Sequence, residues 1–143
     1  MNFRNLKISD YDGVIALWRG CGGLSLRDAD SREGMEKYLR RNPGLSFVAE
    51  DRTGILGTLM AGHDGRRGYI QHLAISPGIR RQGLGARLVE LCLGALKIEG
   101  IEKSHVHVIG ANADGIAFWS SLGWIHRNEI EMYSFINGDN ENA

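Results

Sequence analysis

Cysteine, proline and net charge are all scarce in this sequence of 143 residues. The two cysteines, Cys21 and Cys92, lie far apart and lack a paired spacing, which argues against a disulfide framework and predicts reduced thiols. Seventeen basic residues balance seventeen acidic ones, so the composition provides no broad attraction to nucleic acid or to a membrane surface. We therefore expect neither of these partners.

Long apolar runs are also missing. No segment approaches the roughly 20 apolar residues needed to span a bilayer, and the chain does not open on the apolar stretch of a secretory leader, so we expect a cytoplasmic protein. With 43% hydrophobic residues, the chain has enough apolar side chains for one core, and no linker or internal repeat divides it. The sequence predicts a single domain over residues 1–136 and a flexible tail over residues 137–143.

Strand-like and helix-like segments alternate along the chain, which predicts an α/β (α+β) fold. Apolar runs bounded by turn residues predict strands at residues 3–8, 45–51, 54–63, 68–76 and 104–110, and one or two more within residues 125–136. Helical apolar spacing predicts helices at residues 9–19, 31–42, 83–99 and 112–123. Ser9 followed by Asp12 resembles a capping box for the first helix. The short links between the second, third and fourth strands predict an antiparallel meander.

The stretch "SPGIRRQGLGARLVELCLGAL", from Ser76 to Leu96, places glycine and arginine at the start of a strongly apolar helix. Small residues and free backbone N–H groups at a helix N-terminus suit an anionic, phosphorylated ligand. The P-loop string is absent, and a Rossmann fingerprint would need a third glycine where this chain has Leu88. Taken alone, the glycine loop is equally consistent with an ordinary tight turn.

Two motifs together resemble one family. The string Arg80–Ala86, "RRQGLGA", fits the Q/R-x-x-G-x-G/A signature of the GNAT N-acetyltransferase superfamily. "NADGIAFWSSLGW", from Asn112 to Trp124, resembles the Asn-led helix of that family. The order of elements agrees from Phe3 to about Ile136. The resemblance implies a mixed, mostly antiparallel sheet of six to seven strands, flanked by about four helices and splayed between strands 4 and 5.

The resemblance also implies acetyl-CoA as co-substrate. Its pyrophosphate would rest on the glycine loop at the helix N-terminus, its pantetheine arm would lie along the fourth strand, and Asn112 would bind the arm from the other side. Trp119 would pack against the arm or the core. The cofactor-binding residues expected on this basis are Leu73, Ala74, Ile75, Arg80, Arg81, Gln82, Gly83, Leu84, Gly85, Ala86, Asn112 and Trp119. A solvated basic surface is the alternative interpretation of the two arginines.

For the chemistry, the resemblance implies direct transfer of the acetyl group to an amine in a ternary complex. Histidine is suited to deprotonate the amine, and His107, five residues before Asn112, is the favoured base, followed by His72. A backbone N–H near Leu73 or Ala74 would hold the oxyanion. His105 and His107 alternate along one strand but lack a third ligand, so no metal is expected.

Two positions depart from the family pattern. Trp119 stands where the family usually has the tyrosine that protonates the leaving thiolate, and an indole N–H is not an acid. Tyr133 and Tyr69 are the alternative candidates for that acid. Gly115 replaces the usual alanine and is expected to loosen its helix.

The acceptor is left open by the sequence. A peptide or protein N-terminus, a lysine and a small amine all fit, as do a monomer and a homodimer. Because the usual acid is missing, the alternative function is a coenzyme A-binding sensor or interaction module with little catalytic turnover.

Overall fold

The computed structural model describes residues 1–22 and 24–143. Within them the strands are β1 (Asn2–Asn5), β2 (Phe47–Asp51), β3 (Gly54–His63), β4 (Gly68–Ile75) and β5 (Ser104–Val106). The α-helices are α1 (Tyr11–Arg19), α2 (Arg32–Arg41), α3 (Leu84–Ile98) and α4 (Ala113–Ser121). Three short 3-10 helices are η1 (Ile8–Asp10), η2 (Asp28–Asp30) and η3 (Pro77–Ile79). In this part of the chain, no helix is both long enough and apolar enough to cross a membrane.

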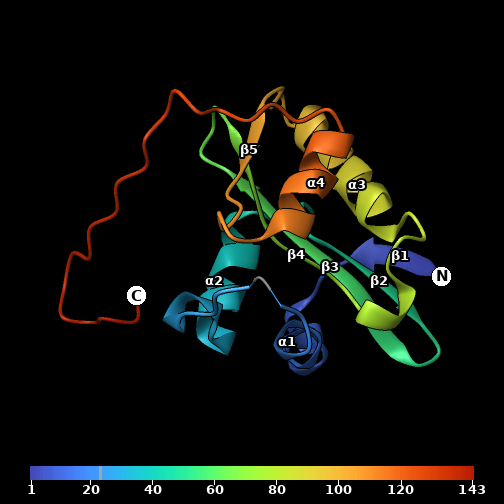
Figure 1. The fold of residues 1–143 in the computed structure, drawn as a ribbon. Coiled ribbons are helices and arrows are strands. Elements are labelled where there is room, and N and C mark those ends of the chain that lie inside the picture. Colours follow the sequence, from blue (N-terminus) through green and yellow to red (C-terminus); the bar gives the residue numbers. More distant parts are fainter. Residues whose placement is uncertain (23) are drawn as a thin grey trace.

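The strands form one mixed sheet in the order β1-β2-β3-β4-β5. The first four pair antiparallel as a meander, and β5 pairs parallel to β4. Helices α3 and α4 cover one face, while α1 and α2 cover the other (Figure 1). The expected α/β class, mixed sheet and four helices are therefore confirmed.

Each face of the sheet carries its own core, because neighbouring side chains on a strand point to opposite faces. Val48 and Ala49 are adjacent on β2 and both fully buried, yet they belong to different layers. The layer under α3 and α4 contains Ala49, Leu59, Ala61, Ile70, Leu88, Val89, Cys92, Leu96 and Trp119. The layer under α1 and α2 contains Val14, Ile15, Trp18, Met35, Val48, Met60 and Ala74. The apolar stripe of α3 thus packs on the sheet, as its spacing requires.

The expected total of six to seven strands is wrong for the described residues, because the segment 125–136 forms no strand there. A strand needs backbone partners and an apolar face that it can bury. Here Ile125, Tyr133 and Phe135 are 82%, 91% and 89% exposed. After α4 the chain instead runs as an extended segment to the side of α2 (Figure 1). Its end meets η2, where Asn140 and Asn142 donate hydrogen bonds to the Asp28 carboxylate.

The start of the first helix also differs from the expected capping box. Ser9 lies inside η1, and the N-cap of α1 is Asp10, whose side chain makes no cap hydrogen bond to α1. The Asp10 carboxylate is engaged elsewhere. It accepts hydrogen bonds from the Lys7 backbone N–H at 2.9 Å and from the Arg4 guanidinium at 2.8 and 2.9 Å.

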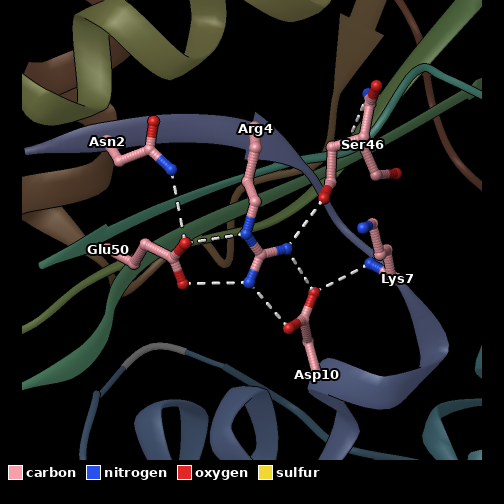
Figure 2. Close-up of polar contacts among 7 residues, drawn as sticks. Asn2, Arg4, Lys7, Asp10, Ser46 and Glu50 are labelled. Carbon is pink, nitrogen blue, oxygen red and sulfur yellow. Dashed lines mark hydrogen bonds and ion pairs between the residues drawn. The ribbon is translucent and has the colours of Figure 1, made fainter. Parts of the chain in front are cut away.

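Arg4 ties the first strand to two other segments (Figure 2). Its guanidinium donates to both carboxylate oxygens of Asp10 on η1 and to both of Glu50 on β2. Bidentate, charge-assisted pairs of this kind are the stronger class of hydrogen bond. The hydrogen bond from Arg4 is the main cause that lowers the pKa of Asp10, and the Lys7 backbone N–H adds to it, whereas burial opposes both. This network fixes the position of the residues that directly precede α1.

We expect Asp10→Ala to lower the free energy of unfolding by about 2 kcal/mol at pH 7, because it leaves Arg4 without one of its two partners. The folded state depresses the pKa of Asp10, so its contribution is present above the ordinary carboxyl pKa and is lost as the pH falls through the folded value. Urea unfolding should therefore show a gap between wild type and variant that narrows below about pH 4.

Asp12→Ala is the matched control. Asp12 is 91% exposed and pairs with Arg32 at 3.5 Å, so its removal should change the unfolding free energy by less than about 1 kcal/mol. If Asp10→Ala and Asp12→Ala lowered the free energy of unfolding equally, the result would contradict a special role for the Arg4 network.

Candidate active site

A cleft of about 1400 Å³ opens where β4 and β5 separate. The two strands pair only from Gly68↔Ser104 to Ile70↔Val106, whereas β4 continues to Ile75. On this edge, the backbone of the last five residues of β4 has no strand partner among the described residues. The cleft is lined by β4, by the loop before α3, by Val106 at the end of β5 with residues 107–109 beyond it, and by α4.

A distortion of β4 accompanies this separation. The pairing of β4 with β3 shifts register between Thr58 and Met60. Opposite this shift, His72 has a φ of +49°, in the left-handed region that non-glycine residues rarely adopt. Bulges of this kind bend a strand and end its regular pairing. Leu73, Ala74 and Ile75, the expected neighbours of the pantetheine arm, follow directly and line the cleft.

The glycine loop lies at the cleft and leads into α3. Gly83 is the N-cap of α3 with a φ of +80°, and the helix start carries no side-chain cap hydrogen bond. A Cβ at Gly83 would meet no atom within 4 Å, so the space above the helix start is open. Gly83 therefore supplies a left-handed turn and leaves the first-turn N–H groups of α3 accessible to a ligand.

Gly85 serves a different purpose from Gly83. A Cβ there would lie 3.1 Å from two ring carbons of Phe118 on α4. The absence of a side chain thus allows α3 and α4 to approach closely, and both helices line the cleft. The two glycines of the motif thus meet two separate constraints, a left-handed backbone at Gly83 and a close helix contact at Gly85.

The structure places almost all of the expected cofactor-binding residues along this cleft. Arg80 and Arg81 line it beside Gly83, Leu84, Gly85 and Ala86, whereas Gln82 does not. The Arg80 Nε donates a hydrogen bond of 3.0 Å to the carbonyl oxygen of Ile75, which fastens the loop to the end of β4. The φ of Arg81 is +68°, so the loop has two successive left-handed positions separated only by Gln82.

Asn112 lies on the opposite wall of the cleft and caps α4. Its Oδ1 accepts a hydrogen bond of 3.0 Å from the backbone N–H of Gly115. A Cβ at Gly115 would lie 2.6 Å from the Asn112 Nδ2 and 3.1 Å from a Val108 methyl. The glycine that departs from the family pattern therefore makes room for the cap. The cap occupies the Asn112 side-chain oxygen.

Trp119 is 7% exposed and belongs both to the core and to the cleft lining. Its ring makes edge-to-face contacts with Phe118 and Trp124, at centroid distances of 5.2 and 4.6 Å. Such aromatic pairs stabilise packing beyond the area that they bury. The position thus provides an aromatic wall.

The tyrosines and cysteines are placed less favourably for chemistry. Tyr69 borders a smaller hollow of about 210 Å³ at the other end of β4, and Tyr133 is 91% exposed. Neither lines the cleft. Burial raises the pKa of the Cys92 thiol, and its side chain is fully enclosed beneath α3. Cys21 lines the cleft with its Sγ 3.5 Å from the Ile75 carbonyl oxygen.

Two histidines reach the cleft, and they differ in their surroundings. His107 is exposed and lies just beyond the end of β5. His72 lies on β4, and its Nε2 is 2.8 Å from the Oδ1 of Asp30. His105 stays outside the cleft next to Tyr69, where burial and then nearby positive charges lower its pKa. No group of three or more potential metal ligands occurs within residues 1–22 and 24–143.

Asp30 is the functional candidate that sequence reasoning missed. It precedes Ser31, the N-cap of α2, and nothing in that local pattern distinguishes it from an ordinary polar residue of a helix start. Its partner His72 is 42 residues away, so only the fold brings the two together.

The structure is therefore that of an α/β protein whose sheet opens between two parallel strands beside an uncapped helix start. Clefts at such openings are common places for ligand sites. Residues 11–124 match the model of the acetyltransferase (GNAT) family, to which the chain therefore belongs. An acetyltransferase of Pectobacterium atrosepticum is 31% identical over 122 residues, which is 85% of this chain and 86% of that protein. The expected family and enzyme class are thereby confirmed.

Two solved structures illustrate the shared fold. The PaiA N-acetyltransferase of Thermoplasma acidophilum in complex with coenzyme A has a TM-score of 0.74 at 18% identity, covering 85% of this chain and 87% of that one. The aminoglycoside antibiotic 6'-N-acetyltransferase of Acinetobacter haemolyticus has a TM-score of 0.78 at 17% identity, covering 96% and 100%.

We expect Gly115→Ala to lower the free energy of unfolding by about 1 kcal/mol, although alanine is the better helix former. The added methyl would displace the Asn112 amide and break the cap of α4. Chemical denaturation followed by circular dichroism measures this change.

Gly94→Ala is the matched control for this variant. Gly94 is exposed within α3, and a Cβ there would meet nothing within 4 Å. This exchange should therefore raise the unfolding free energy by about 1 kcal/mol. Stabilisation by both exchanges would contradict the steric role of Gly115.

Proposed function

We propose that this protein is an acetyl-CoA-dependent N-acetyltransferase that moves the acetyl group to a primary amine by direct attack in a ternary complex. The observation that carries this proposal is the uncapped start of α3 at Gly83, which opens onto the cleft between β4 and β5. Family membership supports the reaction class, and the open start of α3 supports the expectation that the nucleotide end of acetyl-CoA binds there.

The residues of the cleft suit acetyl-CoA. The first-turn N–H groups of α3 and the side chains of Arg80 and Arg81 would hold the phosphates, because both present positive charge to the same opening. The open edge of β4 from Leu73 to Ile75 would accept the amide groups of the pantetheine arm as an added strand would. When bound, the thioester supplies the activated acetyl group.

The acceptor would enter from the side of the segment that joins α1 to α2. Cys21, Gly22, Leu24 and Ser25 of this segment line the cleft together with His72. We propose a primary amine as the acceptor, either a small molecule or the amine of a peptide or protein. The aminoglycoside enzyme of similar fold acts on a small molecule, as its name says.

Protons must move at two points in this reaction. His72 and His107 line the cleft and are the candidates to deprotonate the amine. The leaving thiolate needs a proton, and Trp119 is not an acid. Because Tyr69 and Tyr133 lie outside the cleft lining, we assign that proton to the attacking amine itself.

Thermal unfolding with acetyl-CoA, coenzyme A and NAD as separate additions tests the cofactor part of the proposal. Acetyl-CoA at a hundred times its dissociation constant should stabilise the wild type by about 2.7 kcal/mol and raise Tm by several degrees, while NAD should not. Gly83→Glu should abolish this shift, because it adds a carboxylate at the helix start.

Gly94→Glu is the control, because it adds the same charge to an open position on the same helix. It should leave the acetyl-CoA shift unchanged. No shift in the wild type at saturating acetyl-CoA, or an equal shift with NAD, would contradict the proposal. Release of free thiol in the presence of a primary amine then measures turnover.

A further inference from the structure

His72 and Asp30 form a close, well-enclosed pair at the acceptor side of the cleft. The His72 Nε2 lies 2.8 Å from the Asp30 Oδ1, and the two side chains are only 15% and 13% exposed. One residue comes from β4 and the other from η2. The remaining carboxylate oxygen of Asp30 accepts a 2.9 Å hydrogen bond from the Arg27 backbone N–H. Asp30 is therefore held from two directions.

The backbone of His72 is strained and is fixed by its neighbours. Its φ of +49° is costly for a non-glycine residue and persists only where the surroundings impose it. The Thr58 hydroxyl donates to the His72 carbonyl oxygen at 3.3 Å and accepts from the Trp18 indole N–H at 2.8 Å. The Trp18 ring lies 4.5 Å from the imidazole, centroid to centroid. These contacts orient the ring at the cleft.

The protonation of this pair follows from its partners. Burial raises the pKa of Asp30, but hydrogen bonds from the His72 ring and the Arg27 backbone N–H outweigh it and leave the pKa below its usual value. An ionised carboxylate can only accept, so the Nε2 of His72 carries the proton. The Nδ1 of a neutral His72 is then a free base, and it makes no hydrogen bond with the described residues.

A second histidine–carboxylate pair in the chain shows the contrast. The His63 Nε2 lies 2.9 Å from the Glu99 Oε1, but the His63 Nδ1 accepts a 2.9 Å hydrogen bond from the Gly65 backbone N–H. Both ring nitrogens of His63 are thus occupied, and the residue borders the smaller hollow. The part of the chain that the structure describes gives His107 no carboxylate partner. Of these three histidines, His72 alone combines a carboxylate partner with a free nitrogen at the cleft.

We propose that Asp30 and His72 form a catalytic dyad in which His72 is the general base for the acceptor amine and Asp30 is its positioning residue. This assignment rests on the proposed function. The substrate ammonium gives one proton to the His72 Nδ1. The amine nitrogen attacks the thioester carbonyl carbon, so a C–N bond forms and the C–S bond breaks. The departing thiolate takes the second proton of the amine, and His72 returns its proton to solvent.

The position of His72 on β4 agrees with this role. The next two residues, Leu73 and Ala74, carry the backbone N–H groups expected to hold the oxyanion, and they line the same cleft. The strain at His72 thus turns its side chain and the neighbouring backbone toward one reaction centre.

The test compares His72→Gly and His72→Asn with His63→Gly. Glycine and asparagine both tolerate the left-handed backbone, so either variant removes the base without adding strain. With acetyl-CoA and n-butylamine or a peptide with a free N-terminus as probes, both His72 variants should lower kcat at least about 100-fold. The acetyl-CoA thermal shift should be unchanged, and added imidazole should restore part of the kcat of His72→Gly. His63→Gly should retain the wild-type kcat.

The choice of acceptor amine distinguishes a catalytic role of the Asp30–His72 pair from a purely structural role. Asp30→Asn and the His72 variants should lose most activity with amines that are protonated at the assay pH. They should lose little with an amine whose pKa lies below the assay pH, because that amine needs no base. An equal loss with both amines and no rescue by imidazole would reduce the pair to a structural contact and overturn the dyad.

Two other outcomes are distinguishable. Retention of wild-type kcat by the His72 variants, with a loss in His107→Ala, would transfer the role of base to His107 and overturn the proposal. Absence of any acetyl transfer by the wild type to both probes, with or without a thermal shift, would overturn the proposed function itself and the dyad with it.

Discussion

The separation of β4 from β5 is the constraint on which the rest of the structure depends. Regular pairing of β4 with β5 ends at Ile70↔Val106. Two residues further along β4, the backbone of His72 adopts a left-handed conformation. Beyond that point, the edge of β4 faces a cleft instead of a neighbouring strand. The strain at His72 is sustained by the buried Trp18 and Thr58, whose hydrogen bond lies beneath it. One local distortion, held by the core, therefore creates both the ligand cleft and the orientation of a candidate base.

The formal net charge of this protein is zero, and its charged groups act in small local clusters. The start of α3 and the two arginines beside it concentrate positive charge at one end of the cleft. Asp30 provides an enclosed negative charge where η2 meets β4. The Arg4 network lies elsewhere, joining β1, β2 and η1, and none of its residues lines the cleft (Figure 2). The charged side chains that hold the start of α1 in place are thus different from the charged side chains at the cleft.

Much of the fold and of the glycine-loop end of the cleft could be predicted, because these depend on residues close together in sequence. The helix at α3 and its glycine start are encoded within one stretch, and so is the cap of α4 by Asn112. The two glycines of the motif were predictable as a pair, but their different tasks were not, since Phe118 lies on another helix. The late strands failed as a prediction because alternating apolar residues such as Tyr133 and Phe135 require a partner edge, which local sequence does not specify.

The sequence by itself determined the order of the strands and α-helices as far as α4, the α/β class and the family, because periodicity and short motifs are local properties of the chain. Only the tertiary structure decided which histidine combines a carboxylate partner with a free ring nitrogen at the cleft. His63 and His72 look alike in sequence, yet one has both ring nitrogens occupied and the other keeps one free at the cleft. The carboxylate partner of His72 is Asp30, which the chain places on η2, 42 residues away. A contact across that separation is fixed by how α1, η2 and the bulged β4 pack together, and no local pattern encodes it.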